Sequence, residues 1–91
     1  MKTLPSNVRE TKKTPEFDEQ NIPKGLLKAH QTKEGVWAKI IIMEGSLLYT
    51  INEPELETNI LNPEFPGVVE PTILHEVAPK GPVKFYVQFY E

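Results

Sequence analysis

The clearest pattern in the chain is a two-residue alternation near its C-terminal end. Apolar side chains occupy every second position there, at Val83, Phe85, Val87 and Phe89. The positions between them hold Lys84, Tyr86, Gln88 and Tyr90. Such alternation is typical of a β-strand with one face in a core and the other facing water, a partner or a cavity. It predicts a strand over 83–90.

Further strands are predicted where apolar runs end at turn-forming residues, over 25–30, 36–43, 46–52, 58–61 and 68–77. The segment 36–43 is the richest in β-branched residues and is the best candidate. Glu44-Gly45 interrupts it, and Gly45 is free to adopt the positive φ of a tight turn. The flanking segments therefore predict a hairpin. Its core side chains are expected to be Ile40, Ile42, Leu47 and Tyr49.

No segment shows a sustained helical period, and nine prolines are spread along the chain. Short strands separated by Gly and Pro turns indicate an all-β domain, a small barrel or sandwich. Residues 1–22 are charged and poor in large apolar side chains, so they predict an extended N-terminal arm with an edge strand near 8–11. Residues 23–91 then form the barrel domain.

Composition narrows the classes of function and partner. The net charge of −3 argues against a nucleic-acid partner, which would require a basic face. The absence of cysteine excludes disulfides and thiolate metal sites and favours the cytoplasm. The longest apolar run, 40–43, is too short to span a membrane, and the first residues do not resemble a signal peptide.

The candidate chemistry centres on the only two histidines, His30 and His75. Two imidazoles and one carboxylate can hold a divalent metal, and Glu44 or Glu70 is the carboxylate to consider first. Glu76 is excluded, since neighbours on a strand point to opposite faces. The alternative is that each histidine is an isolated polar residue at a strand end.

A pocket at one end of the barrel is expected to bring the two histidines together. Its ligand-binding residues are predicted to be His30, Trp37, Tyr49 and His75, although core packing or a dimer contact is the ordinary role of a lone tryptophan such as Trp37. No catalytic residue is predicted, because neither serine lies in a nucleophile motif and no glycine-rich phosphate loop is present.

Three motifs together resemble the tellurite-resistance TehB/YeaR-like domain family: H-x-T-K-x-G-V-W at 30–37, E-G-x-L at 44–47 and F-x-V-x-F-Y at 85–90. The resemblance extends from about residue 10 to residue 91. It implies a cupin-like β-barrel, found alone in small bacterial proteins or fused before a methyltransferase domain. In the fused proteins the methyl-transfer chemistry belongs to the other domain, to which none of these residues corresponds.

The chain departs from the metal-binding pattern of typical cupins. The first motif offers only His30, and Ala38 stands where the usual glutamate would fall. His75 stands where the later histidine is expected. The resemblance therefore leaves a two-histidine site in place of a four-ligand one.

Three functions remain open. The first is a non-enzymatic module that binds or senses a small molecule, an oxyanion or a metal ion in tellurite or stress resistance. The second is a small metal-dependent enzyme that uses His30 and His75. The third is a dimerisation or protein-interaction domain that presents Tyr86 and Tyr90. The sequence identifies no cofactor beyond a candidate divalent metal, and it predicts a homodimer without nucleic-acid or membrane partners.

Overall fold

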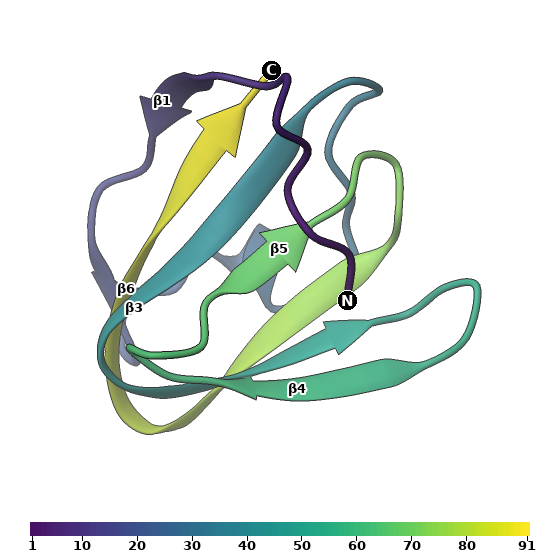
Figure 1. Ribbon diagram of the computed structural model, residues 1–91. Helices are drawn as coiled ribbons and strands as arrows, with labels where there is room; N and C mark the ends of the chain where they lie inside the picture. Colours follow the sequence, from purple (N-terminus) through teal and green to yellow (C-terminus); the bar gives the residue numbers. More distant parts are fainter.

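Two long strands organise the fold, β3 (Trp37–Ile51) and β6 (His75–Tyr90). They pair antiparallel along almost their whole length, from Trp37 opposite Tyr90 to Ile51 opposite His75. The structure is a computed structural model that describes residues 1–91. Figure 1 shows the two strands side by side, both turning sharply at the lower left of the view.

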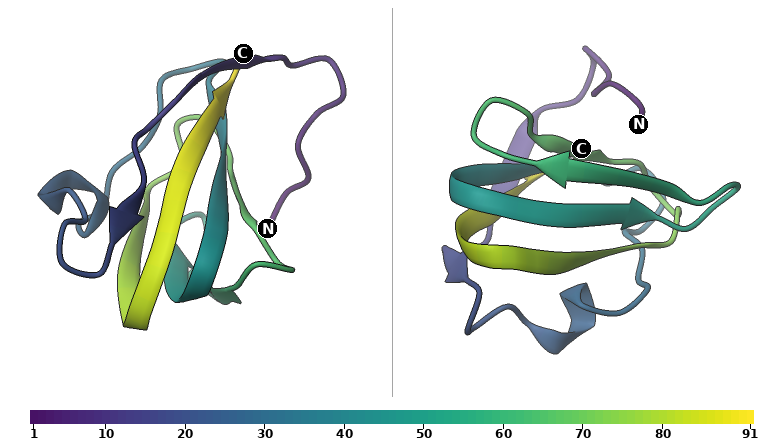
Figure 2. Two further views of the ribbon diagram at one scale, coloured as in Figure 1. Left: turned by 90° about the vertical axis from the view of Figure 1, so that its left-hand side faces the viewer. Right: turned by 90° about the horizontal axis from the view of Figure 1, so that it is seen from below.

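Four short strands complete a six-stranded sheet. Two of them, β1 (Glu10–Lys13) and β2 (Phe17–Asp18), pair antiparallel with β6. The other two, β4 (Glu57–Leu61) and β5 (Gly67–Val69), pair antiparallel with β3. The right-hand view of Figure 2 shows β4, β3 and β6 as three neighbouring ribbons. The predicted all-β fold is confirmed.

The only helical element is η1 (Lys24–Leu26), a single 3-10 turn. A strand predicted over 25–30 is therefore wrong. The backbone N–H groups of Leu26 and Leu27 donate to the carbonyls of Pro23 and Lys24, which closes the turn locally. Pro23, with φ near −54°, directs the chain into this turn. No helix has the length and apolar character that crossing a membrane requires.

A bend at Gly45 replaces the predicted hairpin. Instead of turning back, the chain continues as one strand, and the register with β6 shifts on both sides of Gly45. Gly45 has a φ of +78°, and a Cβ there would lie 2.0 Å from the carbonyl oxygen of Pro82. The hairpin expectation is wrong because both halves of β3 pair with β6, which bends at the same level.

The bend folds the sheet so that both halves share one core. The buried apolar side chains form a single cluster: Ile22, Ala38, Ile40, Ile42, Leu47, Tyr49, Leu61, Val69, Val77, Val83, Phe85 and Val87. The expected burial of the hairpin residues and of three alternating residues of 83–90 is confirmed, and Phe89 is partly buried against the cluster. Gln88, expected on the outer face, is only 8% exposed. Its amide donates to the Lys12 carbonyl at 3.0 Å, because β1 covers this face.

Residues 1–22, expected as an extended arm, contribute both β1 and β2 to the sheet. The edge strand lies at Glu10–Lys13, slightly later than the expected 8–11. The ring of Phe17 packs edge-on against Phe85, with centroids 5.6 Å apart. The expected strand over 68–77 divides in two, because the chain loops between β5 and β6 at Pro71 and Thr72, whose φ is +63°.

Candidate functional site

A backbone bridge brings the two histidines together. The N–H of His30 donates to the His75 carbonyl at 2.9 Å, and the N–H of His75 donates to the His30 carbonyl at 2.8 Å. Their imidazole rings lie 4.1 Å apart between centroids, with their planes tilted by 60°. The structure thus pairs a histidine from the loop before β3 with the first residue of β6.

Hydrogen bonds to the main chain set the tautomer of both rings. His30 Nδ1 lies 2.8 Å from the Lys28 carbonyl oxygen, and His75 Nδ1 lies 2.9 Å from the Ile73 carbonyl oxygen. A carbonyl oxygen can only accept, so each Nδ1 carries the proton that it donates. In the neutral ring the Nε2 atom then keeps its lone pair. Each histidine bonds the carbonyl two residues before it, so the arrangement is the same on both sides.

The environment keeps His75 uncharged. The residue is 4% exposed, and this burial lowers its imidazole pKa. The neighbouring His30 lowers the pKa further, while the hydrogen bond to the Ile73 carbonyl acts in the opposite direction. His75 is therefore neutral at pH 7, since an ordinary imidazole already titrates near pH 6.5.

The histidine pair forms part of the wall of a cavity of about 510 Å³. Most of the wall is apolar and comes from the turn at η1 and from β2, β3, β5 and β6: Phe17, Pro23, Leu26, Val36, Ala38, Ile40, Val69, Val77, Phe85, Val87 and Phe89. Besides the two histidines, polar lining residues come from β1 and the residue after it, from the loop after His30 and from the C-terminal end: Thr11, Lys12, Thr14, Gln31, Thr32, Lys33 and Glu91. A cavity of this size can hold a small organic molecule.

Trp37 and Tyr49 do not line this cavity, contrary to expectation. Trp37 precedes Ala38 on β3, and because neighbours on a strand face opposite ways, it points away from the wall that Ala38 forms. Tyr49 lies behind the wall, with its ring edge-on to His75 at 5.8 Å between centroids.

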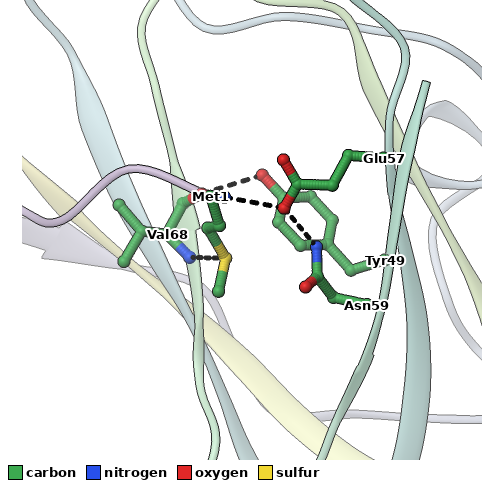
Figure 3. A network of polar contacts seen from close by, with 5 residues as sticks. All are labelled: Met1, Tyr49, Glu57, Asn59 and Val68. Atoms are coloured by element: carbon green, nitrogen blue, oxygen red, sulfur yellow. Dashed lines mark hydrogen bonds and ion pairs between the residues drawn. The ribbon is translucent and has the colours of Figure 1, made fainter. Parts of the chain in front are cut away.

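Figure 3 shows what the other end of the Tyr49 side chain meets. Its hydroxyl donates to the Val68 carbonyl at 2.9 Å, close to an ion pair of the Met1 amine with Glu57. Burial, with smaller contributions from the charges of Glu57 and Glu70, raises the Tyr49 pKa. Tyr49 is thus a neutral side chain that supports His75.

The carboxylates proposed to complete a metal site do not join the histidines. No group of three or more His, Cys, Asp or Glu side chains is placed to hold a metal ion. Glu44 lies 3.5 Å from the Lys84 amine at the bend, and Glu70 lines a different hollow. Protein sites for zinc or non-haem iron use three or four protein ligands. Two imidazoles alone do not fit such a resident metal centre.

The apolar wall is the part of the site that sequence reasoning missed. Phe85, Val87 and Phe89 were expected in the core because of their alternation, which is the same for a packed core and for a cavity wall. The lining residues of β1 belong to a charged segment that predicts an extended arm. The local sequence does not distinguish a packed core from a cavity wall. A cavity forms only where the segments that cover the strand lie far enough from it.

Comparison with known proteins identifies the fold family. Residues 12–87 match the model of the TehB-like domain. No curated protein sequence matches the chain significantly. A crystal structure of an Escherichia coli K12 protein, a structural genomics target, superposes with a TM-score of 0.87 at 22% identity, over 100% of this chain and 97% of that one.

Two further crystal structures share the fold. TehB from Haemophilus influenzae superposes with a TM-score of 0.84 at 24% identity, over 93% of this chain, which corresponds to only 32% of TehB. A cupin-2 domain containing protein from Shewanella frigidimarina gives 0.56 at 16% identity, over 94% of this chain and 72% of that one. These likenesses support a cupin-like fold, and the family model covers most of the sequence. The chain therefore belongs to the TehB-like domain family.

Proposed function

We propose that the chain is a non-enzymatic module that binds a small organic molecule in the cavity beside His30 and His75. One observation carries the proposal: a mostly apolar cavity of about 510 Å³ has two imidazoles in its wall. Small-molecule sites typically combine an apolar wall with a few placed polar groups. A role in tellurite or stress resistance is the biological setting that the family suggests.

An oxyanion such as tellurite is a less suitable occupant. A charged ion leaves water at high cost unless cations or donors replace its hydration shell. The His75 imidazole has a lowered pKa and is neutral, and most of the wall is apolar. Lys12 and Lys33 are the only cationic side chains of the lining, and the Lys12 amine lies 5.8 Å from the centroid of the Phe89 ring.

The metal-dependent enzyme is the weaker alternative for the same site. It would use the Nε2 atoms of His30 and His75, with no third protein ligand. A metal held in this way would bind weakly and exchange readily. Isothermal titration calorimetry with Zn²⁺ distinguishes the two functions. Stoichiometric Zn²⁺ binding at low micromolar concentration would favour the metal-dependent enzyme.

A toluene titration tests the proposed function, because toluene is small, apolar and free of hydrogen-bonding groups. In ¹H–¹⁵N NMR spectra we expect saturable shifts of amides around the cavity, such as those of Ala38 and Phe89. Val36→Phe should weaken toluene binding about tenfold or more, since a larger ring would fill part of the space, and tenfold corresponds to about 1.4 kcal/mol. Trp37→Phe is the control, because Trp37 does not line the cavity. Absence of any saturable shift would contradict the proposal.

A second proposal concerns assembly and rests on a different surface. Strand β4 is at the edge of the sheet, where its outer backbone groups have no strand partner. Ile60 on this strand is 45% exposed, and Phe65 just beyond it is 43% exposed. Unprotected edges with apolar side chains favour pairing with another strand. We propose that a second copy pairs along β4 to form a homodimer.

Sedimentation velocity tests the homodimer at tens of micromolar, a range in which a standard-sized interface is populated. Ile60→Lys should shift the distribution to monomer, because a charge at an apolar edge opposes pairing. Tyr86 and Tyr90, expected to present an exposed aromatic surface, are partly buried, and the Lys13 amine lies 5.4 Å from the centroid of the Tyr86 ring. Tyr86→Phe is therefore a suitable control. Wild-type protein that is monomeric throughout would contradict the proposal.

A further inference from the structure

The histidine pair presents two hydrogen-bond acceptors that the protein leaves unused. Both Nδ1 atoms donate to main-chain carbonyls, so in the neutral form of either ring the lone pair lies on Nε2. No protein group donates a hydrogen bond to either Nε2 atom. The only fully enclosed side-chain nitrogen or oxygen without a partner is Asn52 Oδ1, so the His75 Nε2 atom is not fully enclosed, and His75 is one of the residues that line the cavity.

This arrangement favours ligands whose polar group donates a hydrogen bond over ligands whose polar group only accepts one. Two acceptors on rings 4.1 Å apart favour a group that brings a hydrogen. A carboxylate offers only more lone pairs, so it is repelled while the imidazoles are neutral. An ammonium group brings hydrogens but would lose its hydration in a mostly apolar wall. A neutral hydroxyl donates its one hydrogen to one of these acceptors without moving a charge out of water.

The remaining lining defines the body of the ligand. Val77, Phe85, Val87 and Phe89 from β6 and Val36, Ala38 and Ile40 from the β3 side line the cavity. They lie side by side in one sheet, with Ala38 opposite Phe89 and Ile40 opposite Val87, and form a continuous apolar wall. A flat apolar ring gains burial against such walls. We propose that the ligand class is a neutral phenol, whose ring occupies the apolar part and whose hydroxyl donates to an Nε2 atom of the His30–His75 pair. This inference rests on the proposed function, since it names the occupant of the same cavity.

Three matched probes test the inference: p-cresol, 4-methylanisole and toluene. A hydroxyl that enters an apolar cavity without a partner weakens binding, because it loses its hydrogen bonds to water. We therefore expect p-cresol to bind about 2- to 10-fold more tightly than 4-methylanisole, as one hydrogen bond predicts. In the double variant His30→Leu, His75→Leu this preference should disappear while toluene still binds. Trp37→Phe should keep the preference.

A second measurement on the wild-type protein does not depend on the folding of a variant. In ¹⁵N spectra of the imidazoles, p-cresol should shift an Nε2 resonance of the pair and leave the Nδ1 resonances in place, whereas toluene should not. If toluene binds but p-cresol binds more weakly than toluene without shifting an Nε2 resonance, the phenol inference is wrong and the binding module stands. If no probe binds, the proposed function itself fails.

Discussion

At the end of the β3–β6 ladder next to β4, Leu47, Tyr49 and Leu61 are packed so closely that at most 1% of each is exposed. At the other end, the same two strands present Ile40 and Val87 to a cavity of about 510 Å³. Both ends show the same apolar alternation. The packed end loses stability whenever a side chain shrinks, whereas the cavity end leaves room for a ligand. One ladder thus carries both a packed core and a cavity wall. The two overlap at the end next to β4, where the lining residues Val77 and His75 lie opposite Tyr49 and Ile51.

Gly45 joins the two ends, and its replacement should have the largest effect. We expect Gly45→Ala to lower the free energy of unfolding by about 3–5 kcal/mol, because left-handed backbone and a clash with the Pro82 carbonyl act together. Urea denaturation measures the loss. Gly81→Ala separates the causes, since Gly81 has a φ of +87° but open space around it. Gly25→Ala, with neither constraint, should be close to neutral. An equal loss in all three variants would contradict the clash.

Truncation of one leucine at each end tests the comparison directly. Leu47→Ala should lower the free energy of unfolding by about 3 kcal/mol, because it leaves a void in a closed core. Leu26→Ala should cost about 1 kcal/mol or less, because Leu26 is partly exposed and already borders the cavity. The two midpoints in urea provide the measurement. Similar losses would show that the cavity end is packed as tightly as the other.

The pH dependence of stability should show the burial of His75. Its folded pKa is lowered, so below about pH 6.5 the unfolded chain takes up a proton that the folded protein does not. Above this pH, His75 should therefore add no pH dependence to the free energy of unfolding. It should fall as the pH drops toward the folded pKa, by at most about 1.4 kcal/mol per unit.

His75→Leu removes the titrating group and should flatten this part of the profile. Urea titrations between pH 7.5 and 5.5 compare the variant with the wild-type protein in a range where most carboxylates stay ionised. Parallel profiles for the two proteins would mean that His75 titrates in the same way in the folded and unfolded states.

The smallest effect is expected at the exposed ion pair of the bend. The side chains of Glu44 and Lys84 lie 3.5 Å apart and are 67% and 57% exposed. Glu44→Gln should change the free energy of unfolding by less than about 1 kcal/mol, because solvent screens such pairs. It should also leave p-cresol binding unchanged. A large loss of binding would assign Glu44 the role at the site that the structure does not give it.

The sequence predicted the fold class and most of the core, since the alternation in 83–90 and the apolar segments on either side of Gly45 are local signals. Ile42 and Leu47 were both expected inside, and both are buried. The error lay in the turn, because positive φ suits a hairpin and a bend equally well. Pairing with β6 along the whole of β3 decides between them, and that pairing is not visible in either segment alone.

The candidate site was predictable only in part. Both histidines were singled out because imidazole is rare and chemically versatile, and the structure brings their rings together. Trp37 was misplaced because aromatic character does not indicate the face of the strand. Gln88 was misplaced for a related reason: its burial comes from β1, a segment distant in sequence. A contact between distant segments thus decided the burial of Gln88.

The reciprocal backbone bridge between His30 and His75 affects how far the sequences of related chains can diverge around the site. Every hydrogen bond that fixes the two rings is made to a main-chain carbonyl, and the partners Lys28 and Ile73 contribute no side-chain atom to it. Neighbouring positions are thus free to change identity without moving the imidazoles. A site of this kind leaves only two separated histidines as its signature, so related chains that share it will be recognised by paired positions in the fold and not by a contiguous motif.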